Sequence, residues 1–182
     1  CEDPDTMVDI RYRDIPLGGC PDDLKANGGK GSIAEQLAAS TVDVILGGGS
    51  NHFAPLAEGE TVSVAAMAQR QGFQVVTTLA ETQRADPDRR LLGLFSPDTM
   101  PVRLQGENGR EAEAPQPSLF NRVHHYLGTV TQPAPMKCEP NPAAAGVPGL
   151  RQMTELALAR LSRDNGLGFF LMIESASIDK QS

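Results

Sequence analysis

The order of helical and strand signals along the chain predicts an α/β fold in which helices cover a mostly parallel sheet. Helix signals alternate with short apolar runs, in the order helix–strand, helix–strand, strand, irregular segment, helix–strand. The last apolar run, 168–173, is almost continuously apolar and is bounded by glycine. Such a run is typical of a strand that is buried on both faces of a parallel sheet.

The first helix–strand unit has clear boundary signals. Ser32-Ile-Ala-Glu35 has the spacing of a capping box, which predicts a helix that runs to about Ala39. The apolar run 42–46 then predicts a buried strand, and the three glycines that follow it, 47–49, end that strand.

The next elements repeat the pattern. A helix is predicted over 62–71, ending at Gly72, and it leads into a strand over 74–78. Residues 91–95 are a third short apolar run. These alternating units are what a parallel sheet with crossover helices requires.

An irregular segment and a final helix complete the chain. Residues 97–148 hold most of the prolines and no sustained periodicity, apart from a short amphipathic piece around 119–126. Pro148 suits the first turn of a helix. The apolar stripe of that helix is Leu150, Met153, Ala157 and Leu161, and Asn165 with Gly166 is expected to end it.

Composition limits the function classes. The 182 residues are 40% hydrophobic but only 4% aromatic, with no Trp, so we expect an aliphatic core. The formal net charge is −7, which argues against a nucleic-acid partner and against an anionic membrane surface. No apolar run approaches the roughly 18 residues of a spanning helix. The chain begins at Cys1 rather than Met and shows no signal peptide, so we expect a processed or excised start.

We expect four regions along the chain. Residues 1–31 are a cysteine-bounded loop region, and 32–96 are a first part of the α/β core. Residues 97–146 are an irregular excursion, and 147–182 are a helix–strand part of the core that ends at a loop of candidate metal ligands.

The three cysteines leave two interpretations open. Cys1 and Cys20 bracket a polar segment, and a disulfide between them would contribute roughly 3 kcal/mol in the chain-entropy model. Two unrelated free thiols are the alternative. Cys138 is then left over, which suggests a partner outside this chain.

The acidic residues after the last apolar run are the best candidates for a site. Ligands of open α/β sheets bind beyond the carboxyl ends of the strands. Glu174 stands at the end of 168–173, and Asp179 and Lys180 follow five and six residues later. Two carboxylates there predict a cation site. The alternative is that Glu174 caps a helix or pairs with Lys180 on the surface.

Other motifs indicate local structure rather than chemistry. The loop 27–32 contains Lys30 but lacks the spacing of a phosphate-binding loop, so helix capping explains it better. The glycines 47–49 read as a plain turn after a strand. His124 and His125 are adjacent and cannot share one face of a regular element, and His52 stands alone, so none is assigned a role.

Six ordered segments together resemble bacterial alkaline phosphatases. These are NGGKGSIAEQL at 27–37, DVILGGG at 43–49, LLGLF at 91–95, MPVR at 100–103, CEPNP at 138–142, and GFFLMIE with IDKQ at 168–174 and 178–181. Their order and approximate spacing agree from about Asn27 to Ser182. In the first 26 residues the resemblance is limited to the cysteine-bounded loop.

The resemblance implies a three-layer α/β/α fold and a phosphomonoesterase with two zinc ions and one magnesium ion. In that family a serine attacks the phosphoryl group to give a phosphoserine, and an arginine binds the phosphate. Carried onto this sequence, Glu174 matches the magnesium ligand and Asp179 a zinc ligand. Lys180 matches a residue that contacts phosphate through water. A periplasmic or secreted location, in which a Cys1–Cys20 disulfide could persist, and a homodimer are implied as well.

Departures from the family pattern qualify this reading. The zinc-binding histidine expected four residues after Asp179 falls beyond Ser182, and the nucleophilic serine and phosphate-binding arginine match no residue here. The family's disulfide partner of Cys138 also lies outside the chain, and Ser175 replaces a common glycine. We therefore expect an internal fragment that is inactive by itself. The alternatives are a fragment of another phosphotransferase or phosphodiesterase of the superfamily, and a non-catalytic cation-binding module.

Overall fold

The computed structural model describes residues 21–106, 118–131, 138–163 and 165–175. The chain divides into two compact units. The first consists of residues 1–100 and 148–170, and the second of residues 101–147 and 171–182. None of the helices in the described ranges combines the length and apolar character that crossing a bilayer requires.

A parallel sheet forms the centre of the first unit. Its strands are β1 (Val44–Gly47), β2 (Phe73–Val76) and β3 (Arg90–Leu94), and their order is β1-β3-β2. Leu92 of the central strand pairs with a residue of each neighbour, and both pairings are parallel. The structure therefore confirms the predicted α/β class and the mostly parallel sheet.

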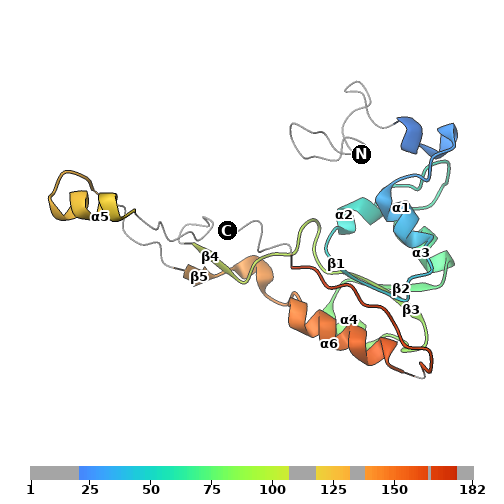
Figure 1. Cartoon of the computed structure of the whole chain (residues 1–182). Helices are drawn as coiled ribbons and strands as arrows, with labels where there is room; N and C mark the ends of the chain where they lie inside the picture. Colours follow the sequence, from blue (N-terminus) through green and yellow to red (C-terminus); the bar gives the residue numbers. More distant parts are fainter. Residues whose placement is uncertain (1–20, 107–117, 132–137, 164, 176–182) are drawn as a thin grey trace. The chain divides into compact units, whose positions relative to one another are not determined.

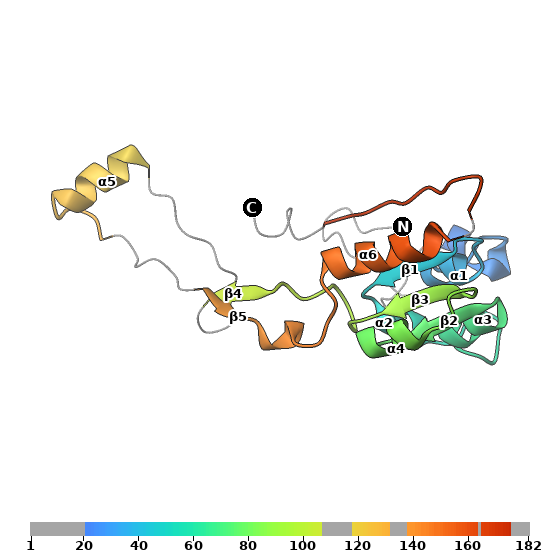
Figure 2. The same ribbon diagram turned by 90° about the horizontal axis from the view of Figure 1, so that it is seen from below.

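Helices cover both faces of this sheet (Figure 1). α1 (Ile33–Ala38), α2 (Ser50–Phe53) and α3 (Val64–Arg70) lie on one face. α4 (Leu79–Arg84) and α6 (Leu150–Leu161) lie on the other. α6 packs along β1, as Figure 2 shows from below.

Local capping explains where most of these helices begin. Ser32 and Glu35 form the predicted capping box, in which Glu35 N–H donates to Ser32 Oγ and Ser32 N–H donates to Glu35 Oε2. Thr78 and Glu81 form a second box at α4, and Ser63 caps α3. Each cap satisfies backbone N–H groups that the first helical turn leaves unpaired.

The core is rich in alanine, which lets the short helices approach the sheet closely. Leu91 and Leu92 of β3 are fully buried, as expected for a central strand. Three phenylalanines, Phe53, Phe73 and Phe95, are buried although the composition indicated an aliphatic core. The main cluster consists of Ala34, Ala38, Phe53, Ala57, Val64, Ala68, Phe73, Leu92 and Leu94.

The second unit contains a small antiparallel sheet that the sequence did not reveal. β4 (Leu104–Gly106) pairs with β5 (Cys138–Pro140), across the proline-rich segment. Asn141 extends the pairing, because its backbone N–H donates to Arg103 O at 2.9 Å and its Nδ2 donates to Val102 O at 2.8 Å. A 3₁₀ turn, Pro142–Ala144, follows β5. The amphipathic piece predicted around 119–126 is confirmed as α5 (Leu119–Tyr126).

The predicted buried strand at 168–173 is wrong in this structure. These residues have no regular secondary structure, and Phe170 and Met172 are 89% and 76% exposed. An apolar run shows that burial would be favourable, but a strand also needs a neighbour that accepts its backbone hydrogen bonds. Within the described residues, 168–173 pair with none of the five strands.

Candidate functional site

The carboxyl ends of β1 and β3 are joined by a ladder of backbone hydrogen bonds. Gly49 N–H donates to Asp98 O at 2.8 Å, Ser50 N–H to Ser96 O at 3.0 Å, and Asn51 N–H to Pro97 O at 2.9 Å. This edge is where open α/β sheets usually bind ligands. The ladder holds the loops after both strands in a fixed register.

Polar side chains complete this edge. Ser96 is buried, and its hydroxyl lies 2.8 Å from Asp98 O and 3.1 Å from Thr99 O. His52 Nε2 lies 4.0 Å from Asp98 Oδ1, and the Asp98 side chain is exposed. A histidine beside one carboxylate supplies too few ligands for a metal ion. Over the described ranges no three or more His, Cys, Asp or Glu residues gather to hold one.

Gly48 is required by the close approach of these two loops. A Cβ at this position would overlap Asp98 O and Ser96 Oγ, whereas a Cβ on Gly47 would meet no atom within 4 Å. We expect Gly48→Ala to lower the free energy of unfolding by about 1–3 kcal/mol, because the backbone of the 96–99 loop must move. Gly47→Ala is the matched control and should cost less than about 1 kcal/mol. Urea unfolding of both variants measures the difference, and equal effects would contradict this account.

Two of the predicted site residues, Glu174 and Cys138, are described, and both are exposed. Glu174 lies in the segment 171–175, which has no regular structure, and it is exposed. Asp179, Lys180, Cys1 and Cys20 lie outside the described residues. Cys138 is free and exposed at the start of β5. The predicted metal site and the two interpretations of Cys1 and Cys20 therefore stay predictions.

The buried carboxylate of Glu35 holds the segment 27–37 in place; this is the first of the segments that resemble alkaline phosphatases. Glu35 is only 4% exposed. Its Oε1 accepts from Glu58 N–H and forms an ion pair with Lys25 Nζ, both at 2.8 Å, and its Oε2 accepts from Ser32 N–H at 2.8 Å. Burial alone would raise the pKa of Glu35, but Lys25 and the two backbone donors together lower it to about 2. Nothing in the sequence pattern pointed to this network apart from the capping box.

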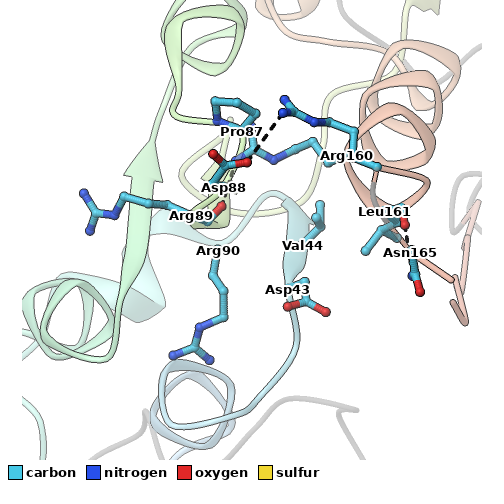
Figure 3. A pocket seen from close by; sticks show the side chains of 10 residues that line it. Asp43, Val44, Pro87, Asp88, Arg89, Arg90, Arg160, Leu161 and Asn165 are labelled. Atoms are coloured by element: carbon cyan, nitrogen blue, oxygen red, sulfur yellow. Dashed lines mark hydrogen bonds and ion pairs between the residues drawn. The ribbon is translucent and has the colours of Figure 1, made fainter. Parts of the chain in front are cut away.

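A pocket of about 260 Å³ lies at the opposite, amino end of β1 and β3 (Figure 3). Its side chains are mostly charged, and sequence reasoning did not single them out. They are Asp43, Val44, Pro87, Asp88, Arg89, Arg90, Arg160, Leu161, Arg163 and Asn165.

Three of the four arginines of this pocket, Arg90, Arg160 and Arg163, are engaged by the protein itself, Arg163 by an ion pair with Asp88. Arg160 donates to the carbonyl oxygens of Asp86 and Arg89, and Arg90 donates to those of Ser40 and Gln71. Burial lowers the pKa of Arg160, and Arg163 lowers it further. Arg89, Arg90 and Arg160 point in different directions in Figure 3. The pocket is therefore a junction that ties α6 to the turn before β3, not a convergent anion site.

Comparison with known proteins decides the family. The family model for alkaline phosphatase matches residues 9–182, which is nearly the whole chain. This chain belongs to the alkaline phosphatase family. The match includes the capped segment at 27–37, the ladder at the end of β1 and the exposed Glu174. The resemblance noted on the six sequence segments is thus confirmed.

Individual relatives agree with this assignment. Alkaline phosphatase H of Pseudomonas aeruginosa is 40% identical over 171 residues, covering 89% of this chain and 32% of that protein. Escherichia coli alkaline phosphatase is 40% identical over 169 residues, with the same coverage. Streptomycin-6-phosphate phosphatase of Streptomyces griseus is 38% identical over 179 residues, covering 91% and 35%. The chain therefore spans about a third of the length of these relatives.

A solved structure shows a weaker similarity. The crystal structure of Thermus thermophilus alkaline phosphatase aligns with a TM-score of 0.45 and 26% identity, over 75% of this chain and 21% of that one.

Proposed function

We propose that this chain is part of a metal-dependent alkaline phosphatase that hydrolyses phosphate monoesters through a phosphoserine intermediate. The family match over residues 9–182 carries the proposal, because it includes Glu174, Asp179 and Lys180 in one stretch. The relatives named as phosphatases at about 40% identity support the same reaction class. The family's periplasmic or secreted location and its homodimer belong to the proposal as well.

The donor chemistry of the described carboxylate fits the metals that this proposal requires. Glu174 is exposed, so its carboxylate oxygens are accessible to a metal ion without any rearrangement of the chain. Magnesium usually takes one or two protein carboxylates and completes its shell with water and phosphate oxygens. Asp179, a carboxylate that also suits zinc, follows within five residues. Bound metal ions would neutralise charge that develops on the phosphoryl oxygens.

The chain's own residues have separate tasks in this proposal. Glu174 would hold the magnesium ion, and Asp179 would hold a zinc ion. The Lys180 ammonium would donate, through a water molecule, to a phosphate oxygen. The Glu35 network and the loop ladder at Gly48 and Gly49 act on folding of the domain, not on the phosphate.

The chain by itself is expected to be inactive. The resemblance carries over no nucleophile and no arginine for the phosphate, so zinc and magnesium should elicit no hydrolysis of p-nitrophenyl phosphate. The product of the complete reading frame, in contrast, should hydrolyse this monoester in a metal-dependent manner. Both proteins should be assayed side by side after treatment with a chelator and after addition of metal.

Substrate panels separate the proposal from its alternatives. The complete product should prefer p-nitrophenyl phosphate and phosphosugars over bis(p-nitrophenyl) phosphate. A preference for the diester would favour a phosphodiesterase of the superfamily. Metal binding without any hydrolysis by the complete product would leave a cation-binding module and would refute the phosphatase proposal.

A further inference from the structure

An asparagine–glycine pair, Asn165-Gly166, follows the end of α6. Both residues are exposed, and neither belongs to a helix or strand. The chain has two further Asn-Gly pairs, at 27–28 and, outside the described residues, at 108–109. In such a pair the backbone nitrogen of the glycine can attack the asparagine side chain, because glycine has no Cβ to hinder the approach. The surroundings of each pair decide whether this attack takes place in the folded chain.

The side chain of Asn165 is folded back onto the backbone that would attack it. Leu167 N–H donates to Asn165 Oδ1 at 3.2 Å, which closes an Asx turn around Gly166. The turn keeps the carboxamide beside the Gly166 nitrogen, and the Leu167 N–H would stabilise the negative charge that develops on Oδ1 during attack. Asn165 Nδ2 donates to Leu161 O at 3.1 Å (Figure 3). This bond is at the surface, so water can replace it when the amide leaves.

The attacking nitrogen is available as well. Among the described residues, none accepts a hydrogen bond from Gly166 N–H. A Cβ built on Gly166 would meet no atom within 4 Å, so a five-membered ring has room to close. The backbone of Gly166 is also outside the left-handed region, which means that alanine can replace this glycine without strain.

The other described pair, Asn27-Gly28, is held in a closed turn. Gly28 N–H donates to Lys25 O at 3.0 Å, so its nitrogen is already engaged. Gly29 N–H donates to Leu24 O at 2.9 Å across the same turn. The turn must open before Gly28 can attack Asn27, whereas no such opening is required at Asn165. The structure therefore distinguishes two identical dipeptides.

We propose that Asn165 is a site of spontaneous deamidation. The Gly166 nitrogen gives up its proton to a base and forms a bond to Asn165 Cγ. The Cγ–Nδ2 bond breaks, and Nδ2 takes a proton from water and leaves as ammonia, which produces a succinimide. One water molecule then opens the ring. Opening at Cγ gives aspartate, and opening at the backbone carbonyl gives isoaspartate, in which the main chain passes through Cβ and Cγ. Neither step is an oxidation or a reduction, and water is the only co-reactant.

Deamidation changes the end of α6. An aspartate at position 165 cannot donate to Leu161 O, and its negative charge adds to the partial negative charge of the helix C-terminus. Arg160 and Arg163 line the same pocket as Asn165 and offset only part of this charge. We therefore expect faster hydrogen exchange of the last turn of α6 in the deamidated chain than in the fresh chain.

Peptide mapping of the whole chain, aged in a mildly alkaline buffer, tests the proposal. Cleavage by trypsin after Lys30, Arg110 and Arg163 places the three Asn-Gly pairs on separate peptides. Mass spectrometry should show that Asn165 becomes a carboxylic acid at least about tenfold faster than Asn27, because the turn at 27–28 must first lose its hydrogen bonds. An isoaspartyl methyltransferase should label the aged 165–166 peptide, which a direct hydrolysis of the amide would not produce.

Two variants and a denatured control make the test specific. Gly166→Ala should slow the reaction at Asn165 at least about tenfold, because a Cβ hinders ring closure, and should keep the far-UV circular dichroism of the parent chain. Ser162→Ala, at an exposed position of the same turn, should leave the rate within about twofold. In guanidinium chloride the rates at Asn27 and Asn165 should agree within about threefold, since the turns are lost.

Three results would overturn the proposal. The first is a rate at Asn27 that equals or exceeds the rate at Asn165 in the folded chain. The second is an unchanged rate at Asn165 in Gly166→Ala, which would exclude the succinimide. The third is reaction at Asn165 in denaturant only, which would show that the folded turn protects this side chain.

Discussion

Glu35→Gln is expected to lower the free energy of unfolding by about 2–4 kcal/mol. The two backbone donors, Ser32 N–H and Glu58 N–H, reach different oxygens of the Glu35 carboxylate, both at 2.8 Å. An amide has one oxygen, so either orientation of the glutamine turns an NH₂ group toward a backbone N–H. One buried donor then has no acceptor, and Lys25 loses its charged partner.

The loss should also spread beyond α1. Glu35 connects the segment 25–35 to the loop at Glu58, and the Glu58 carboxylate accepts from Lys25 N–H at 2.9 Å and from Ala26 N–H at 3.0 Å. The 3₁₀ turns Pro21–Asp23 and Lys25–Asn27 depend on this link. We therefore expect faster hydrogen exchange in residues 21–31 of the variant than in the parent.

The same carboxylate makes stability depend on pH in a defined window. The pKa of Glu35 is lowered from 4.5 to about 2 in the folded chain. A depressed pKa contributes stability that is fully present above about pH 4.5 and is lost as pH falls toward 2. The contribution is at most about 3 kcal/mol. Urea midpoints measured from pH 6 down to pH 2.5 should fall less steeply for Glu35→Gln than for the parent chain.

Glu60→Gln is the control for this experiment, because Glu60 is an exposed glutamate of the same region. Its unfolding free energy should stay within about 0.5 kcal/mol of the parent value. If Glu35→Gln were as stable as Glu60→Gln at pH 7, the network would not hold the 25–35 segment.

Local signals in the sequence were sufficient for most, but not all, elements of the first unit. The capping box at Ser32 and the apolar run at 91–95 each involve only a few neighbouring residues. The interactions that form these elements can therefore be recognised in the sequence itself. α2, a single turn, and α4 were not predicted, although Thr78 and Glu81 form a capping box that could have revealed α4. β4 and β5 were not predicted because each is three residues long and the pairing joins positions more than thirty residues apart.

At 168–173, in contrast, a strand was predicted where the structure has none. The segment is apolar, yet Phe170 and Met172 are exposed. The strand prediction failed because an apolar run does not specify which strand would pair with it. The site was predicted less completely than the fold. Glu174 stays a predicted ligand, singled out as the polar residue after this run and by the family resemblance. The Glu35 network joins residues 25, 35 and 58, which no spacing rule connects.

Glu174→Gln in the product of the complete reading frame should reduce phosphatase activity at limiting magnesium by at least about tenfold. The reason is that an amide oxygen carries no charge, so it binds a hard divalent cation more weakly than a carboxylate does. Mutations around metal sites commonly cost 10–100-fold in metal affinity or activity. High magnesium concentrations should recover part of the rate, which a variant that merely unfolds would not show.

Glu139→Gln provides a matched control, since Glu139 of β5 is also an exposed glutamate of the second unit. Its magnesium dependence should equal that of the parent protein. Isothermal titration of the present chain with magnesium supplies a readout that needs no turnover: binding should be weak and should disappear in Glu174→Gln. If both variants keep the parent's magnesium affinity, Glu174 is not a metal ligand, and the carboxylate that ends the apolar segment has a structural role only.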